Sequence, residues 1–178
     1  DGQVGLFCVG DGETYNVPVE MAETRYGIRV DEHSLHTDGA GAGEYRGGSG
    51  AVRVYRSMNE NQTFTASFGR NKWPVWGAAG GKDGSVNYFQ FIDADGTVSE
   101  PMGIAARRVM NTNDVVRMVT ATGGGYGNPF KRPAEKVAMD VKNEYITVEQ
   151  AKADYGVLVD PETFKVLGLT EERQKAEK

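Results

Sequence analysis

The chain has 178 residues, of which 39% are hydrophobic and 25% charged, and its formal net charge is −5. This length fits one domain, or one domain with an appended helical tail, and the composition supports a modest core rather than a disordered chain. An acidic chain does not attract a phosphate backbone, so no nucleic-acid partner is expected.

The compartment is inferred from cysteine usage and hydropathy. The single cysteine, Cys8, cannot form an internal disulfide, and a lone thiol suits a reducing compartment. No signal peptide is apparent, and no apolar run reaches the roughly 18 residues that a membrane helix needs. We therefore expect a cytoplasmic protein without a membrane partner. The first residue is Asp1 rather than Met, which fits a processed or nicked chain.

A short helix is predicted near the start of the chain. Asn16 is placed to cap it, and Pro18 lies in its first turn, where the missing N–H costs little. Val19, Ala22 and Tyr26 recur at helical spacing and therefore share one face.

Strands follow, predicted at residues 28–30, 51–57, 63–68, 86–92 and 115–121. The clearest is Thr63–Phe68, in which Phe64, Ala66 and Phe68 alternate with Thr and Ser. This alternation is typical of a half-buried antiparallel strand. Asp93-Ala-Asp-Gly96 predicts a hairpin turn.

The pattern changes to helix after Pro129. Thr147-Val-Glu-Gln150 is a capping box, and its helix is predicted to stop at Gly156. A further short helix is expected from Asp160 to Gly168, followed by a charged tail over residues 171–178. An earlier helical stripe comprises Val137, Ala138 and Val141.

The predicted fold class is therefore α+β. We expect a mainly antiparallel β body with glycine-rich loops at residues 1–129, and a helical C-terminal segment at residues 130–178. The 24 glycines cluster at Gly39–Gly50, Gly77–Gly84 and Gly123–Gly127 without a fixed period. Such clusters indicate positive-φ turns or close approach of backbones.

The glycine run after the last strand permits two interpretations. Gly123, Gly124, Gly125 and Tyr126 could bind phosphate through backbone N–H groups. The P-loop lysine and Ser/Thr are absent, however, so a tight turn or a subunit contact is favoured, with the run acting as a hinge. We expect Gly124→Val to disturb assembly, because a β-branched residue at a positive-φ site is strained.

Two other glycine-rich stretches invite a functional interpretation. Gly80–Ser85 superficially resembles a P-loop, but Asp83 follows Lys82 where Ser or Thr is required. Trp73 and Trp76 could line a substrate pocket, or anchor a loop to a core or to a neighbouring chain. Because tryptophan is common at interfaces, the anchor is favoured.

The remaining reactive side chains form no recognisable site. On a strand, His33 and His36 point to opposite faces, and Asp31 with His33 supplies too few ligands for a metal. Ser49 lacks the second glycine of a nucleophile elbow, and Cys8 lacks a motif that would lower its pKa. The catalytic residues are therefore unknown, and no metal ligand is predicted.

Four segments, in order, resemble the C-terminal third of hydantoinase B and 5-oxoprolinase B-type subunits. They are Asn16–Glu20 (Asn-Val-Pro-Val-Glu), Gly41–Gly48 (Gly-Ala-Gly-Glu-Tyr-Arg-Gly-Gly), Trp73–Lys82, and Thr122–Pro129 (Thr-Gly-Gly-Gly-Tyr-Gly-Asn-Pro) with Asp154–Val157 after it. Each motif is weak alone, and their joint order and spacing make the resemblance specific. The chain departs from the family pattern at Asn128 (commonly Asp), at Gly27 (commonly Pro) and in a tail beyond Val159.

The resemblance implies an enzyme built from an A-type and a B-type part. The A-type part resembles sugar-kinase-like ATPases, and ATP activates a carbonyl oxygen by phosphorylation. Hydantoinases and oxoprolinases then hydrolyse a ring amide, whereas acetone and acetophenone carboxylases fix bicarbonate-derived carbon. The chain is thus expected to be the C-terminal portion, or a split piece, of a B-type subunit that is not active alone. Ring-amide hydrolysis is preferred; the alternatives are a ketone carboxylase subunit and a purely structural subunit.

The resemblance also implies where cofactors and contacts lie. No cofactor is expected on this chain, since ATP with Mg and a divalent metal belong to partner subunits. The expected partners are the A-type subunit and the upstream part of the B-type subunit. The candidates for a substrate loop or an interface are Arg46, Trp73, Trp76, Lys82, Gly123, Gly124, Gly125, Tyr126 and Asn128.

Overall fold

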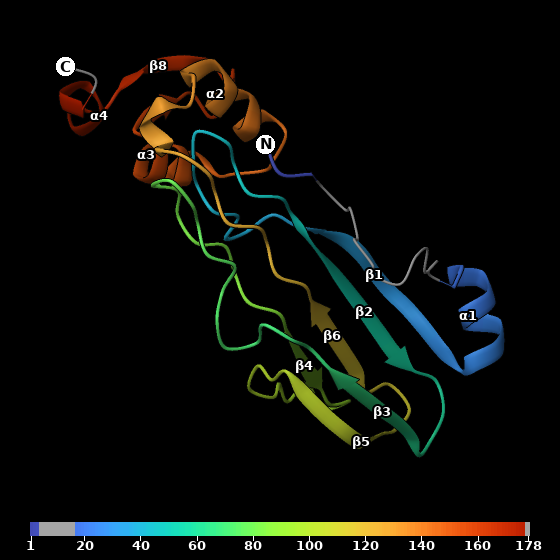
Figure 1. Ribbon diagram of the computed structural model, residues 1–178. Helices are drawn as coiled ribbons and strands as arrows, with labels where there is room; N and C mark the ends of the chain where they lie inside the picture. Colours follow the sequence, from blue (N-terminus) through green and yellow to red (C-terminus); the bar gives the residue numbers. More distant parts are fainter. Residues whose placement is uncertain (4–16, 177–178) are drawn as a thin grey trace.

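The computed structural model describes residues 1–3 and 17–176, so Asn16 and Cys8 lie outside the described residues. Figure 1 shows an elongated molecule with a sheet at its centre, C-terminal helices at one end and one helix beyond the edge strand. None of the described helices is long and apolar enough to cross a membrane.

The central sheet is antiparallel, with the order β1-β2-β6-β4. Its strands are β1 (Ile28–His36), β2 (Gly50–Ser57), β6 (Val115–Val119) and β4 (Tyr88–Ile92). The turn predicted after β4 is confirmed: Gly96 has φ +88 and its N–H donates to the Asp93 carbonyl at 2.8 Å. β-Branched and aromatic residues dominate β6 and β4, as expected for strands buried in a sheet.

A two-stranded sheet packs on one face of the central sheet. It pairs β3 (Gln62–Ser67) with β5 (Ile104–Met110) in antiparallel register. The predicted apolar face of the first strand is confirmed, because Phe64 and Phe68 pack on Phe89 and Phe91 with ring centroids 5.5–5.6 Å apart in edge-on geometry. We call these four phenylalanines the aromatic core.

The strand β5 was not anticipated. It carries Arg107 and Arg108 in its middle, Arg107 has φ +52, and the register shifts opposite Phe64–Ala66. A bulge of this kind interrupts the alternation on which strand prediction depends. The strand β5 therefore forms because it pairs with β3, and its own residue pattern does not predict it.

The helix α1 (Val19–Tyr26) begins after Pro18 and ends at Gly27, which has φ +60. Only residues that tolerate a left-handed backbone fit this C-cap, and proline, fixed near φ −65°, does not. The departure from the family pattern at Gly27 therefore has a direct structural reason.

The C-terminal segment confirms the α+β class but is not wholly helical. It contains η1 (Pro129–Lys131), α2 (Ala134–Lys142), α3 (Val148–Tyr155), β7 (Val157–Val159), β8 (Val166–Leu169) and α4 (Glu171–Ala176). The predicted capping box is confirmed, because the Thr147 N–H donates to Gln150 Oε1 at 2.8 Å and the Gln150 N–H donates to Thr147 Oγ1 at 3.1 Å. Gly156 ends this helix as predicted, at φ +64.

The helix predicted from Asp160 to Gly168 is wrong. The Asp160 carboxylate accepts N–H bonds from Glu162 and Thr163, which closes a turn, and the chain then returns as β8 against β7. An Asx-type turn competes with a helix N-terminus for the same side chain, and strand pairing selects the turn. The tail is also more than a charged extension, because Arg173 of α4 is 4% exposed.

Candidate functional site

The glycine-rich loops meet in one place, between the central sheet and the C-terminal helices. We call residues 41–48, 76–84 and 122–127 together the glycine core. Its backbones are hydrogen-bonded to one another: Gly41 N donates to Gly123 O at 2.9 Å, Lys82 N to Ala42 O at 2.7 Å, and Gly125 N to Lys82 O at 2.9 Å. The run at residues 122–127 is therefore one layer of a backbone bundle in which all three loops bond to one another.

The glycines are required by close approach. A Cβ on Gly125 would lie 2.2 Å from the carbonyl oxygen of Ala42, and one on Gly47 would lie 2.0 Å from that of Gly123. A real Cβ does not come this close to backbone atoms, so the segments can approach one another to these distances only where the residue is glycine.

The positive-φ conformation expected at Gly124 is wrong. The positive-φ glycines do not include it, and a Cβ there would instead lie 2.2 Å from the carbonyl oxygen of Trp76. The expected effect of Gly124→Val on assembly stays a prediction, now with backbone collision as its physical basis.

A phosphate cradle would need free N–H groups in this run. Gly123 N donates to Gly48 O at 2.8 Å, Tyr126 N to Tyr45 O at 2.9 Å, and Gly127 N to Ala78 O at 2.9 Å. These donors are committed to carbonyl groups within the glycine core. The run is also held on both sides, which does not suit a freely moving hinge.

Two candidates fasten the ends of the glycine core. Lys82 Nζ pairs with Asp154 of α3 at 2.5 Å, and Asp83 accepts the Gly77 N–H at 2.8 Å. Asn128 Oδ1 accepts the Phe130 N–H at 2.9 Å and so caps η1. An aspartate could accept the same bond, so the family's alternative residue would preserve this turn.

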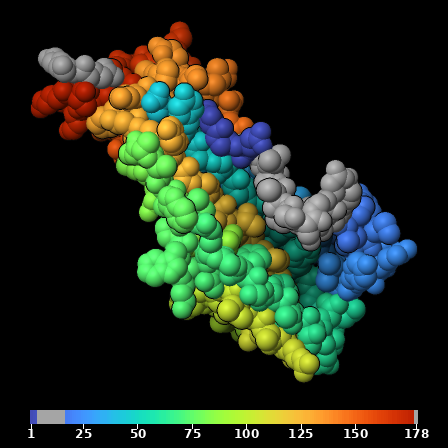
Figure 2. Space-filling model, in the orientation of Figure 1, coloured from blue at the N-terminus to red at the C-terminus, as the bar shows by residue number. Residues whose placement is uncertain are grey.

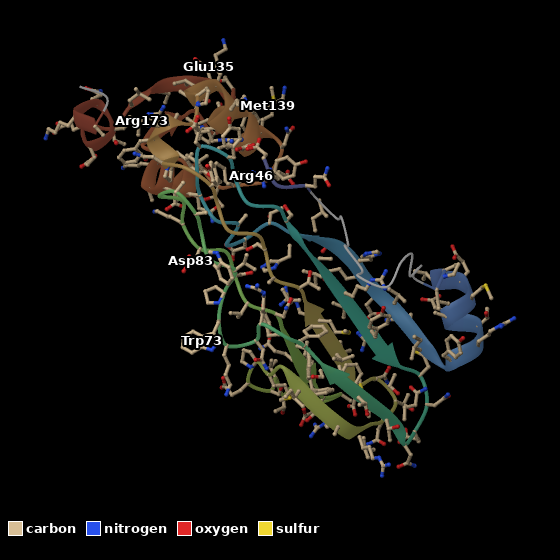
Figure 3. All side chains as sticks on the ribbon, viewed as in Figure 1. Arg46, Trp73, Asp83, Glu135, Met139 and Arg173 are labelled. Carbon is tan, nitrogen blue, oxygen red and sulfur yellow. The ribbon has the colours of Figure 1, made fainter. Side chains whose placement is uncertain are left out.

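Arg46 is buried at the junction between the glycine core and the C-terminal helices (Figure 3). Its Nε lies 3.6 Å from Asp140 Oδ2, its Nη1 donates to Gly47 O at 2.8 Å, and its Cζ lies 4.5 Å from the centroid of the Tyr145 ring. At 3% exposure, Arg46 cannot contact a partner without rearrangement.

Arg132 is buried beside Arg46 and Asp140, and we call these three residues together with the exposed Asp1 the arginine cluster. Arg132 is 1% exposed; it pairs with Asp140 at 2.8 Å and holds the Asp1 carboxylate through two bonds of 2.5 and 2.9 Å. Buried charges persist only when paired, so these contacts tie the C-terminal helices to the glycine core.

Tyr155 and Arg173 lie against the arginine cluster. Arg173 donates to the carbonyl oxygens of Tyr155 at 3.0 Å and Arg132 at 2.8 Å, and so links α4 to the chain beside the cluster. Burial raises the pKa of the Tyr155 hydroxyl to about 12. Its oxygen has no hydrogen-bond partner among the described residues.

The sequence does not predict the buried positions of the tail residue Arg173 or of the pair Arg132–Asp140. Each is an ordinary charged residue in a helical segment, with no motif around it. The one available signal was Pro129-Phe-Lys-Arg132-Pro133, where prolines on both sides fix the path of the chain at Arg132.

The two tryptophans do not anchor to the chain's own core. Trp73 is 80% exposed and Trp76 is 69% exposed, with Arg70 stacked 5.1 Å from the ring centroid of Trp76. Figure 2 shows their segment, in green, projecting from the surface, and Figure 3 shows Trp73 pointing away from the body.

The histidines and Ser49 remain outside any polar constellation. His33 is exposed, and His36 Nδ1 lies 2.8 Å from Thr120 O. Within residues 1–3 and 17–176, no three His, Cys, Asp or Glu side chains gather as metal ligands would.

Comparison with known proteins gives one family. The model of the hydantoinase B/oxoprolinase family matches residues 1–129. The chain is 32% identical over 148 residues to the B component of a candidate D-/L-hydantoinase of Pseudomonas sp. strain NS671, covering 82% of this chain and 25% of that protein. It is 30% identical over 158 residues to the beta component of the caprolactamase of Pseudomonas jessenii, covering 80% of this chain and 25% of the relative.

Solved structures agree with these sequence matches. The ATP-dependent caprolactamase of Pseudomonas jessenii superposes with a TM-score of 0.69 at 29% identity, covering 89% of this chain and 27% of that one. A nucleotide-free acetone carboxylase superposes with a TM-score of 0.69 at 17% identity, covering 90% and 25%, and so shows the shared fold. The chain spans about a quarter of the length of the relatives it matches. It belongs to the hydantoinase B/oxoprolinase family.

Proposed function

We propose that the chain is the C-terminal part of the B-type subunit of an ATP-dependent hetero-oligomer that hydrolyses a ring amide. The observation that carries the proposal is the pattern of identity: among superposed structures the chain is 29% identical to a caprolactamase and 17% identical to acetone carboxylase, and it is 32% identical in sequence to a hydantoinase component. Hydantoins and lactams share a cyclic amide, so the nearer relatives share the bond that is broken.

In the proposed reaction the A-type partner transfers the γ-phosphoryl group of ATP to the amide carbonyl oxygen. Water then attacks the activated carbon and the ring C–N bond breaks, which leaves an acyl phosphate and a protonated amine. A second water attacks the acyl carbon to give the carboxylate, and phosphate leaves with the former carbonyl oxygen. ATP with Mg is expected on the A-type subunit, and a divalent metal on the upstream part of the B-type subunit. We assign no chemical step to this chain's own side chains.

Its role in the complex is to complete the B-type fold and to present a rigid contact surface. The loop that carries Trp73 and Trp76 is fixed at its base by the glycine core, because Ala78 N donates to Gly125 O at 2.9 Å. Exposed tryptophans on a rigid base bury large apolar area at little cost in conformational entropy, which suits an interface.

A complex purified through this chain tests the proposal. ATP turnover is measured with hydantoin, 5-oxoproline, caprolactam, acetone and acetophenone, each with and without bicarbonate, and products are identified by mass spectrometry. We expect a cyclic amide to stimulate turnover without bicarbonate and to appear ring-opened. Turnover that needs both a ketone and bicarbonate would instead establish the carboxylase alternative.

Two further outcomes bear on the chain's own role. If the isolated chain hydrolyses a ring amide without ATP, the proposed division of labour is refuted. If Trp73→Ser with Trp76→Ser leaves the thermal midpoint of the isolated chain unchanged but weakens recovery of the partners, the interface role is supported. Normal recovery with lost turnover would place the tryptophans at the substrate instead.

A further inference from the structure

The described chain has an open apolar groove beside the central sheet. Its volume is about 570 Å³. β1 and β2 form its floor, α1 forms one wall, and β3 with the end of β5 forms the other. The apolar residues that line it include Val19, Ala22, Tyr26, Val30, Tyr55 and Phe64.

The floor of the groove continues the aromatic core. Val30 pairs with Tyr55, Tyr55 with Val116, and Val116 with Phe91, so one cross-strand row runs over the face of the whole sheet. Under β3 and β5 the row is closed, with Val116 2% and Phe91 4% exposed. Beyond them its members are only half-buried. Among residues 1–3 and 17–176, a second layer thus covers one half of this face and leaves the other half open.

The charged side chains at the groove already have partners. Arg56 pairs with Asp31 at 2.6 Å, and Arg53 Nη1 donates to Tyr55 Oη at 3.0 Å. The groove therefore offers mainly apolar surface. Exposed apolar surface of this extent, continuous with a core, is typical of the cut face of a larger domain.

We propose that the groove receives an apolar segment from the upstream part of the B-type polypeptide. This inference rests on the proposed function. The relatives extend for about three quarters of their length beyond the region matched here, so they carry the polypeptide that a missing second layer requires. Figure 1 shows α1 beyond the edge strand β1. A segment bound in the groove would therefore contact α1 on one side and β3 on the other.

Site-specific photocrosslinking tests the proposal. Benzoylphenylalanine replaces Tyr26, which lines the groove and is 55% exposed; the matched control replaces Leu167 of β8, which is 67% exposed and far from the groove. The chain is co-produced with the upstream B-type polypeptide and the A-type subunit of the same genome. We expect crosslinks from position 26, and none from position 167, to the upstream B-type polypeptide.

A variant supplies an independent measurement. Val19→Asp places a carboxylate at the first turn of α1, where a helix tolerates it, so the isolated chain should keep its thermal midpoint within about 2 °C. Affinity for the upstream polypeptide should fall at least about tenfold. Leu167→Asp should leave it unchanged.

The contrary outcomes separate two failures. If the chain recovers the upstream B-type polypeptide but position 26 crosslinks to residues 4–16, to a second copy or to the A-type subunit, the groove inference is overturned and the proposed function stands. If no B-type polypeptide is recovered at all, the proposed function itself fails.

Discussion

The glycine core and the aromatic core belong to one β body, but they are packed in different ways. In the glycine core, backbone meets backbone, and a Cβ on Gly47 or Gly125 would approach a carbonyl oxygen to 2.0 or 2.2 Å. In the aromatic core, rings meet edge to face at 5.5–5.8 Å. A side chain can change rotamer to accommodate a substitution, whereas a hydrogen-bonded backbone cannot. We therefore expect the aromatic core to tolerate substitution much better than the glycine core.

The largest effect is expected in the glycine core. Gly125→Ala forces a methyl group against the Ala42 carbonyl oxygen, and we expect it to cost more than about 4 kcal/mol of unfolding free energy. The measurement is urea denaturation followed by circular dichroism. Gly69→Ala is the matched control, because nothing lies within 4 Å of its added Cβ, and it should change stability by less than about 0.5 kcal/mol. Equal effects would abolish the distinction between the cores.

A substitution in the arginine cluster tests whether the stability of the glycine core depends on these buried ion pairs. Asp140→Asn removes the carboxylate that lies 2.8 Å from Arg132 and 3.6 Å from Arg46, and leaves the two buried guanidinium groups with the Asp1 carboxylate alone. We expect a loss of about 3 kcal/mol by the same denaturation assay. The control is Asp154→Asn at the more exposed Lys82 pair, where less than about 1 kcal/mol should be lost. A small effect at both positions would show that hydrogen bonding alone holds the glycine core.

A smaller effect is expected in the aromatic core. Phe89 is fully buried, but Phe89→Leu replaces one apolar side chain with another that can repack. We expect a loss of about 1.5 kcal/mol with the fold retained, as judged by near-ultraviolet circular dichroism and denaturation. A loss as large as that of Gly125→Ala would mean that ring geometry is as demanding as backbone contact.

The smallest effect at neutral pH is expected at Tyr155. Its hydroxyl is buried without a hydrogen-bond partner among the described residues, so Tyr155→Phe should cost less than about 1 kcal/mol at pH 7. Because the folded-state pKa is raised from 10.0 to about 12, the unfolded chain loses its proton first as the pH rises. The stability of the native protein should therefore decline between pH 10 and 12, whereas Tyr155→Phe should lack this component of the decline. Parallel curves for the two proteins would contradict the burial of this hydroxyl.

The sequence by itself determined features that depend on neighbours along the chain. The Thr147–Gln150 capping box, the left-handed stop at Gly156 and the alternating face of β3 are local, because each rests on bonds or periodicity within a few residues. The ordered glycine motifs likewise identified the family. These motifs can be recognised from the order of residues alone, without knowledge of what the glycines contact.

Only the tertiary structure decided what those motifs touch. The strand β5, the β7–β8 hairpin and the buried positions of Arg46 and Arg173 arise from pairing between distant segments, which local propensity does not encode. The glycine run shows the difference most directly: its composition allows a cradle, a hinge or a packed layer. Carbonyl groups from two distant loops accept the N–H bonds of Gly123, Gly125, Tyr126 and Gly127. A Cβ on Gly124 or Gly125 would lie 2.2 Å from a carbonyl oxygen, so the run forms a packed layer.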